Sequence, residues 1–306
     1  MIGGIEVSVA GLGCNNFGRR IDEQRTREVV AAALDAGVTC FDTADVYGDG
    51  RSEEFLGRAL GARRDEVVIV TKFGGGNPAA GAAPDRVPLA CNASLRRLGT
   101  DRIDVYLLHV PHPATPIGDT LGALNELVDA GKVREIGCSN FTAAQLDEAA
   151  TAAKGGGLRP FVTVQNEYSL LHRDPEKGVL QACERLGMSF MPYFPLGSGV
   201  LTGKYRRGEP VPGGTRLGGD GGKLAEHVIA EDRLDVAERV RAFAESRRHT
   251  LLELAMSWVA TQPGVATVIA GATSPEQVRA NSASLAAWAL ADDELRAIDE
   301  LTRPEP

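Results

Sequence analysis

Four side chains of this 306-residue chain form a set that could carry out acid–base chemistry: Asp42, Tyr47, Lys72 and His109. A free tyrosine has a pKa of about 10, and a neighbouring ammonium group lowers that pKa because it stabilises the phenolate. Tyr47 beside Lys72 would therefore donate a proton more readily near neutral pH, and Asp42 would orient the lysine. The N–H group of His109 could polarise a carbonyl oxygen as negative charge develops on it.

Taken singly, these residues have ordinary structural explanations. Asp42 could cap a loop, Lys72 could be an exposed lysine after a strand, and His109 could be a satisfied core histidine. Their shared position favours chemistry, because each lies at or just after the C-terminal end of a predicted strand. Charged side chains are rarely buried without a partner, so Lys72 and Asp42 would pair there.

Eight short β-rich segments alternate with helical ones. We expect strands at residues 9–12, 38–44, 66–71, 103–109, 134–140, 161–166, 188–194 and 266–271. This alternation predicts parallel β-α-β units, for which an open doubly wound sheet is the alternative. Eight regular units favour a single α/β domain over residues 1–306, a (β/α)8 TIM barrel. We also expect a short N-terminal β-hairpin and long loops at the C-terminal face.

The expected helices are marked by their terminal residues. Residues 22–36 carry an apolar face that ends at Gly37, and residues 117–130 end at Gly131. Thr142 and Gln145 form a T-x-x-Q capping box that starts another helix.

Two glycine-rich segments resemble phosphate-binding motifs but depart from them. In GLGCNNFG (residues 11–18) the third glycine is misplaced for a Rossmann fingerprint, and no helix is expected to begin there. In GSGVLTGKY (residues 197–205) five residues, rather than the four of a P-loop, separate the two glycines, and Tyr205 replaces the Ser or Thr.

A third phosphate candidate is the segment at residues 271–281. Ser274 is a good N-cap, Pro275 suits the first helical position, and Gln277 completes an S-x-x-Q box. A helix N-terminus can bind an anion, and the loops after strands seven and eight of α/β barrels commonly hold phosphate. An ordinary capped helix explains the same residues equally well. The Gly- and Pro-rich residues 197–225 are likewise either a surface insertion or a loop over the barrel mouth.

The composition argues against nucleic-acid and membrane partners. The chain has 33 basic and 41 acidic side chains, which gives a formal charge of -8. Proteins that bind nucleic-acid phosphates or anionic membranes need basic patches instead. The N-terminus has no signal-peptide pattern, and no apolar run reaches the roughly 18 residues that span a bilayer. Scattered cysteines without a C-x-x-C pair indicate reduced thiols: Cys14, Cys40, Cys91, Cys138 and Cys183. We expect a cytoplasmic monomer or small homo-oligomer.

Other chemistries find less support. No serine or cysteine nucleophile is accompanied by a base, so acyl transfer is not expected. His109 and His112 flank Val-Pro without a carboxylate or cysteine cluster, so we expect no metal site.

The chain resembles the aldo-keto reductase family over nearly the whole sequence, and six ordered segments carry the resemblance. FDTADVYGDGRSEEFLGRAL (residues 41–60) is similar to its D-T-A-x-x-Y-G-x-x-S-E pattern. The other segments are VTKFG (70–74), VYLLHVPHP (105–113), IGCSNF (136–141), VQNEYSLL (164–171) and PYFPLGSGVLTGKY (192–205).

The resemblance implies an enzyme that transfers a hydride directly from a nicotinamide cofactor to the carbonyl carbon of a small-molecule aldehyde or ketone. Tyr47 would be the general acid, Lys72 and Asp42 would tune it, and His109 would orient the carbonyl. The implied cofactor residues are Ser139, Asn140 and Gln165 for the carboxamide, Tyr193 for stacking, Pro195, Leu196 and Gly199 for the pyrophosphate, and Gly271, Gln277 and Asn281 for the adenosine end.

The chain also departs from the family. Members often carry Lys or Arg at the start of the helix after strand eight, where this chain has Gly271 and Gln277. We expect NADP with NAD as the alternative. Phe194 stands where a serine is common, and His112 replaces a frequent aspartate, so the resemblance does not name the substrate. Phe17 is expected to line the substrate site.

Two alternative functions remain. Channel β-subunits also resemble this family, so the protein could be a cofactor-binding regulatory subunit. It could also be a barrel aldolase that uses Lys72 as a Schiff-base amine, which requires a neutral lysine.

Overall fold

The computed structural model describes residues 1–76, 81–213, 215 and 231–303, in which strands alternate with helices. The strands are β1 (Ala10–Gly13), β2 (Cys40–Asp42), β3 (Val68–Phe73), β4 (Ile103–Leu108), β5 (Val133–Ser139), β6 (Thr163–Gln165), β7 (Ser189–Phe190) and β8 (Val268–Gly271). The α-helices are α1 (Glu23–Asp35), α2 (Arg51–Leu60), α3 (Arg86–Leu98), α4 (Ile117–Asp129), α5 (Ala143–Gly156), α6 (Val179–Leu186), α8 (Glu231–Ser246), α9 (Leu251–Ala260), α10 (Pro275–Ser284) and α11 (Asp292–Thr302). The 3-10 helices of the described residues are η1 (Tyr47–Gly50), η2 (Gly61–Glu66), η3 (Asp174–Lys177) and η4 (Gly197–Thr202).

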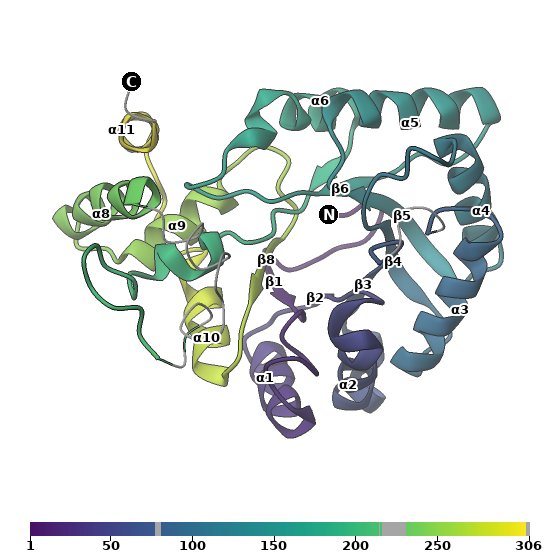
Figure 1. The fold of residues 1–306 in the computed structure, drawn as a ribbon, viewed down its shortest axis with the longest axis horizontal. Helices are drawn as coiled ribbons and strands as arrows, with labels where there is room; N and C mark the ends of the chain where they lie inside the picture. The colour runs from purple at the N-terminus through teal and green to yellow at the C-terminus, as the bar shows by residue number, and fades with distance from the viewer. Residues whose placement is uncertain (77–80, 214, 216–230, 304–306) are drawn as a thin grey trace.

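All eight strands belong to one parallel sheet with the order β7-β6-β5-β4-β3-β2-β1-β8. The two ends of the sheet come together beyond β7, where Phe190 accepts from the backbone N–H of Ala266 at 2.9 Å and Pro192 accepts from Ile269 at 2.9 Å. Figure 1 shows the helices arranged around the outside of this curved sheet. The predicted TIM-barrel-like arrangement is confirmed, and these contacts exclude an open sheet.

Strand alternation explains how polar residues reach the inside of the barrel. An apolar cluster fills the interior and contains Ile2, Ile5, Cys40, Val68, Val70, Val105, Leu107, Met191, Ala266 and Ile269. Asp42, Lys72 and His109 each lie two positions after a member of this cluster. Because side chains alternate along a strand, all three therefore point to the same inner face, above the apolar layer.

Most predicted boundaries agree with the structure to within a few residues. Asp22 accepts from the N–H of Arg25 at 2.8 Å and caps α1, and Thr142 and Gln145 form the predicted capping box of α5. At the N-terminus a single antiparallel bridge joins Ile2 to Ile5, in place of the two strands of a hairpin. In the described part of the chain, no helix is long and apolar enough to cross a membrane.

A buried carboxylate at the start of β4 ties three segments together. Asp104 is fully buried and accepts from Arg64 at 2.7 Å, from Arg134 at 2.9 Å and from the backbone N–H of Ile69 at 2.9 Å. It therefore joins η2, β3 and β5 at the end of the sheet away from the polar residues described above.

Asp104→Ala leaves this set of donors without an acceptor, so we expect the free energy of unfolding to fall by about 3–5 kcal/mol. Urea denaturation measures the change. Asp101→Ala is the control, because the Asp101 side chain is 91% exposed and lies 3.7 Å from Arg102; its loss should stay below about 0.5 kcal/mol. Equal, small losses in the two variants would contradict this account.

Candidate active site

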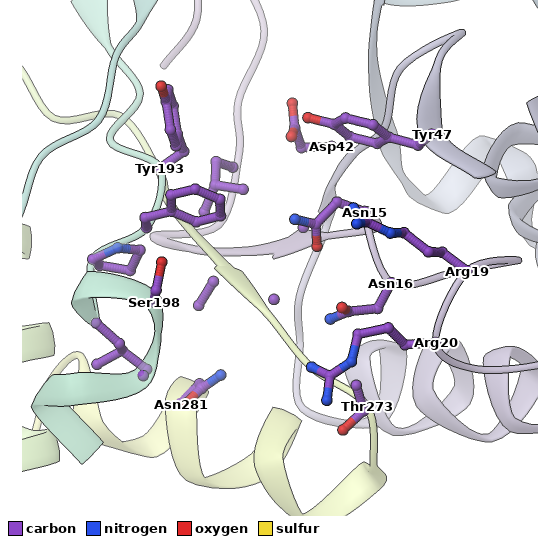
Figure 2. A pocket seen from close by; sticks show the side chains of 18 of the residues that line it. Asn15, Asn16, Arg19, Arg20, Asp42, Tyr47, Tyr193, Ser198, Thr273 and Asn281 are labelled. Atoms are coloured by element: carbon purple, nitrogen blue, oxygen red, sulfur yellow. The ribbon is translucent and has the colours of Figure 1, made fainter. Parts of the chain in front are cut away.

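A cavity of about 840 Å³ opens at the C-terminal ends of the strands. It runs from the loops after β2 and β4 to the start of α10, and Figure 2 shows Tyr47 and Asp42 at one end and Thr273 and Asn281 at the other. Of the predicted site residues, those that line this cavity are Asp42, Tyr47, His109, Ser139, Asn140, Gln165, Tyr193, Pro195, Leu196, Gly199, Gly271, Gln277 and Asn281. Lys72 is the exception, because it is fully buried.

The Lys72 ammonium is enclosed by acceptors. Its Nζ donates to the two carboxylate oxygens of Asp42 at 2.7 and 2.8 Å and to the carbonyl oxygen of Thr43 at 2.8 Å, and it lies 5.1 Å from the centroid of the Tyr47 ring. Burial is the largest single influence and lowers the pKa of Lys72, but Asp42 and Tyr47 together raise it by more, so the pKa lies above its ordinary value. Lys72 is therefore a charged lysine, which argues against the Schiff-base alternative.

The YGDG turn directs Tyr47 toward Lys72. Gly48, Asp49 and Gly50 all have positive φ, and a Cβ on Gly48 would lie 2.9 Å from the carbonyl oxygen of Phe17. The turn leads directly into α2, which is anchored by the buried Glu53.

Two buried residues of the segment at residues 41–60, Ser52 and Glu53, fix α2 to its neighbours. Glu53 accepts from Thr71 and from Arg97, each at 2.6 Å, and Ser52 donates to the carbonyl oxygen of Cys14 at 2.8 Å. These bonds connect α2 to β3, α3 and the end of β1, so they hold the turn that carries Tyr47.

The pKa of Tyr47 differs from the sequence-based prediction. Burial raises it, and the charge of Lys72 lowers it by less, so the pKa lies above its ordinary value instead of below it. Lys72 acts in the predicted direction, but the desolvation of the phenol was not visible in the sequence. Tyr47 is consequently a protonated phenol at neutral pH.

His109 is a neutral imidazole next to Tyr47. The two ring centroids are 5.9 Å apart with an interplanar angle of 81°. Burial, helped by the nearby charge of Lys72, lowers the pKa of His109 to about 3. Its Nδ1 is buried and has no hydrogen-bond partner among the described residues, so no protein contact there fixes which ring nitrogen carries the proton.

The polar residues at the ends of β5 and β6 form a hydrogen-bonded network. Gln165 donates from Nε2 to Asp42 Oδ1 at 2.8 Å, and Ser139 donates to the carbonyl oxygen of Gln165 at 2.8 Å. Asn140 donates to the carbonyl oxygen of His109 at 2.9 Å and accepts from the hydroxyl of Tyr193 at 2.8 Å. The acid–base residues and the predicted carboxamide residues are thus physically connected.

Several residues that line the cavity were not predicted from the sequence, and one predicted residue lies elsewhere. Asn15 and Asn16, in the segment dismissed as a Rossmann motif, line the cavity, and so do Arg19 and Arg20 just after that segment; α1 begins only at Glu23. Lys204 also lines the cavity. The sequence did contain a signal for it, because Lys204 lies in the GSGVLTGKY segment that resembles a phosphate-binding motif. Phe17, expected at the substrate site, is instead fully buried in the larger core cluster, where its backbone bridges to Ile21.

Gln277 and His112 make contacts that the sequence did not predict. Ser274 caps α10, but the Gln277 side chain accepts from the N–H of Thr273 at 2.8 Å, so the predicted S-x-x-Q box is shifted by one residue. His112 is buried with its Nε2 2.9 Å from the carbonyl oxygen of Gly74, and it does not line the cavity. Of the predicted long loop, residue 214 and residues 216–225 lie outside the described residues.

The cysteines are all free and buried, and burial raises the pKa of Cys40 to about 12. No group of three or more His, Cys, Asp or Glu residues in the described ranges is arranged to hold a metal ion.

The profile of the Aldo/keto reductase family matches residues 10–303, and the chain belongs to this family. It is similar to Aldo-keto reductase YhdN of Bacillus subtilis, with 33% identity over 97% of this chain and 91% of that protein. A probable voltage-gated potassium channel subunit beta of Arabidopsis thaliana is 35% identical over 91% of this chain and 87% of that protein. The glycerol dehydrogenase AKR11B4 from Gluconobacter oxydans has a similar structure, with a TM-score of 0.83 and 29% identity, over 100% of this chain and 96% of that one.

The resemblance found in the sequence is therefore confirmed. Family membership supports an oxidoreductase, from a family that generally uses NAD(P)H on small-molecule carbonyl compounds.

The low pKa of His109 predicts a pH-dependent stability. The folded-state pKa of about 3 lies below the ordinary 6.5, so the unfolded chain binds one more proton between these values. Stability should fall as the pH drops below about 6.5, by at most about 1.4 kcal/mol per pH unit from this residue. Urea denaturation of wild type and His109→Gln between pH 5 and 7.5 should give a steeper acid loss for wild type. Parallel curves would refute a neutral, buried His109.

Proposed function

We propose that the protein transfers a hydride from a nicotinamide cofactor, with NADPH preferred over NADH, to an aldehyde or ketone. The observation that carries this proposal is the buried Lys72 ammonium, which pairs with the Asp42 carboxylate and lies 5.1 Å from the centroid of the Tyr47 ring. A charge held in this way needs no reorganisation when the phenol loses its proton, so it stabilises the developing phenolate.

The proton steps follow from the positions of these side chains. The bound cofactor supplies the hydride that reduces the carbonyl carbon. Tyr47 gives its phenolic proton to the carbonyl oxygen, and the charge left on the phenolate is stabilised by Lys72 until a proton is taken up from water. His109, as a neutral N–H donor, orients the carbonyl oxygen. In the reverse direction the Tyr47 phenolate is the base that takes the alcohol proton.

The nicotinamide end would lie against the network at the ends of β5 and β6. Gln165 uses an amide N–H for Asp42, so its side-chain oxygen can accept from a carboxamide. Ser139 and Asn140 would complete this contact, and the Asn140 oxygen must then exchange the Tyr193 hydroxyl for the carboxamide N–H. Tyr193 would stack on the nicotinamide ring.

The middle of the cavity fits a dinucleotide because backbone is exposed there. A Cβ on Gly199 would lie 3.0 Å from Lys204 Nζ, so the residue there leaves its backbone open to the cavity. Bare backbone beside an ammonium group suits a pyrophosphate. Pro195, Leu196 and Gly199 would line the pyrophosphate, and Gly271, Gln277 and Asn281 would take the adenosine end.

A regulatory subunit without turnover is less well supported. Some relatives are named as channel β-subunits, but a protein that only binds a cofactor has no need of a proton donor held by a buried charge. We further propose one domain over residues 1–306, acting in the cytoplasm as a monomer or small homo-oligomer; the five free cysteines suit a reducing compartment.

Tyr47→Phe removes the proton donor, so we expect the kcat for carbonyl-dependent NADPH oxidation to fall roughly 10²- to 10⁴-fold while NADPH binding changes little. Tyr106→Phe is the matched control, because the Tyr106 hydroxyl is buried and has no hydrogen-bond partner among the described residues; its kcat should match that of wild type. The assay uses a panel of aldehydes, ketoses and quinones. Full activity in Tyr47→Phe would overturn the proton-donor role, and tight NADPH binding without carbonyl-dependent oxidation by wild type would favour the regulatory alternative.

A further inference from the structure

The geometry points to Arg20, in the loop after β1, as the residue that binds the 2′-phosphate of NADPH and so sets the preference for NADPH over NADH. This inference rests on the proposed function, in which the cavity holds a nicotinamide cofactor. The contact with the 2′-phosphate would come from the loop after β1, because the start of α10 has no positively charged side chain to make it.

The start of α10 offers no cation to the cavity. Its lining residues there are Gly271, Thr273 and Gln277. The backbone N–H and hydroxyl of Thr273 already donate to the Gln277 side chain at 2.8 and 3.2 Å, and the N–H of Gln277 donates to Ser274 at 3.4 Å. Several donors at this helix N-terminus are therefore occupied, and a phosphate dianion bound there needs a positive charge from another segment.

Asn16 ties Arg20 to this part of the cavity. The carbonyl oxygen of Asn16 accepts from the backbone N–H of Arg20 at 2.8 Å, and its side-chain amide donates to the carbonyl oxygen of Ala272 at 3.1 Å. Asn16 is only 7% exposed, so this connection is internal to the structure. One buried residue thus holds the backbone of Arg20 beside the segment that leads into Thr273.

The side chain of Arg20 extends from this anchor across the cavity wall. Figure 2 shows its guanidinium turned toward Thr273, whereas that of Arg19 is turned toward Asn15, nearer the middle of the cavity. Both arginines line the cavity and both are exposed. The direction of Arg20 places its charge at the adenosine end, where NADPH and NADH differ.

The charge of Arg20 is also available. Within the described residues, neither Arg20 nor Arg19 forms an ion pair, whereas Arg25 on the following helix lies 2.7 Å from Glu28. Arg279, a cation on α10 itself, lies 3.9 Å from Glu276 and does not line the cavity. A planar guanidinium with parallel N–H donors matches a phosphate in two-point contact. The chain as a whole is acidic, with a formal charge of -8, so an arginine guanidinium at the cavity wall provides local positive charge for an anionic ligand.

The test compares ligands that differ only in the 2′-phosphate. Calorimetry measures binding of 2′,5′-ADP, 5′-AMP, NADPH and NADH to wild type, Arg20→Gln and the neighbouring control Arg19→Gln. We expect Arg20→Gln to weaken 2′,5′-ADP and NADPH roughly 10- to 100-fold and to change 5′-AMP and NADH less than about 3-fold. In Arg19→Gln the ratio of the NADPH and NADH dissociation constants should stay near that of wild type.

The inference is overturned if Arg20→Gln weakens all four ligands equally, or if wild type binds 2′,5′-ADP no tighter than 5′-AMP. Thermal unfolding checks that the exposed substitution leaves the fold intact. These measurements need no turnover, so they fail or succeed separately from the proposed function, which is tested by carbonyl-dependent oxidation in wild type and Tyr47→Phe.

Discussion

A fully buried ammonium group must be neutralised where it lies, and Lys72 meets this requirement with one carboxylate and one carbonyl oxygen. Much of the site is arranged around this constraint. Asp42 is in turn held by Gln165 at 2.8 Å, and Tyr47 is held by a turn that is anchored through α2. The pair Lys72–Asp42 therefore connects Tyr47, the proposed proton donor, with the predicted carboxamide residues on the other side.

The same low-dielectric surroundings act on each titratable group in a different way. Burial raises the pKa of Tyr47 and lowers that of His109 to about 3, while Asp42 keeps Lys72 charged. At neutral pH the site thus contains a neutral phenol, a neutral imidazole and one ion pair. This combination can donate a proton and a hydrogen bond to the same oxygen, as reduction of a carbonyl group requires.

The sequence was sufficient for features that depend on local periodicity. Strand alternation places Asp42, Lys72 and His109 on one inner face, and all three were predicted from the strand ends. Features that depend on distant contacts were not predictable in this way. Asn16 meets Ala272 across 256 positions of the chain, so the role of the first loop in the cavity was missed. The raised pKa of Tyr47 comes from desolvation by segments that no local pattern brings together.

A double-mutant cycle on Lys72→Met and Asp42→Asn tests the central claim most directly, with unfolding free energy and kcat both measured. Each single variant should lose about 3–5 kcal/mol of stability, because it leaves one buried charge without its partner. The double variant should recover part of that loss, yet its kcat should remain at least about 100-fold below wild type. A double variant that reduces carbonyl compounds at nearly the wild-type rate would show that the pair serves only the fold, and would contradict this account.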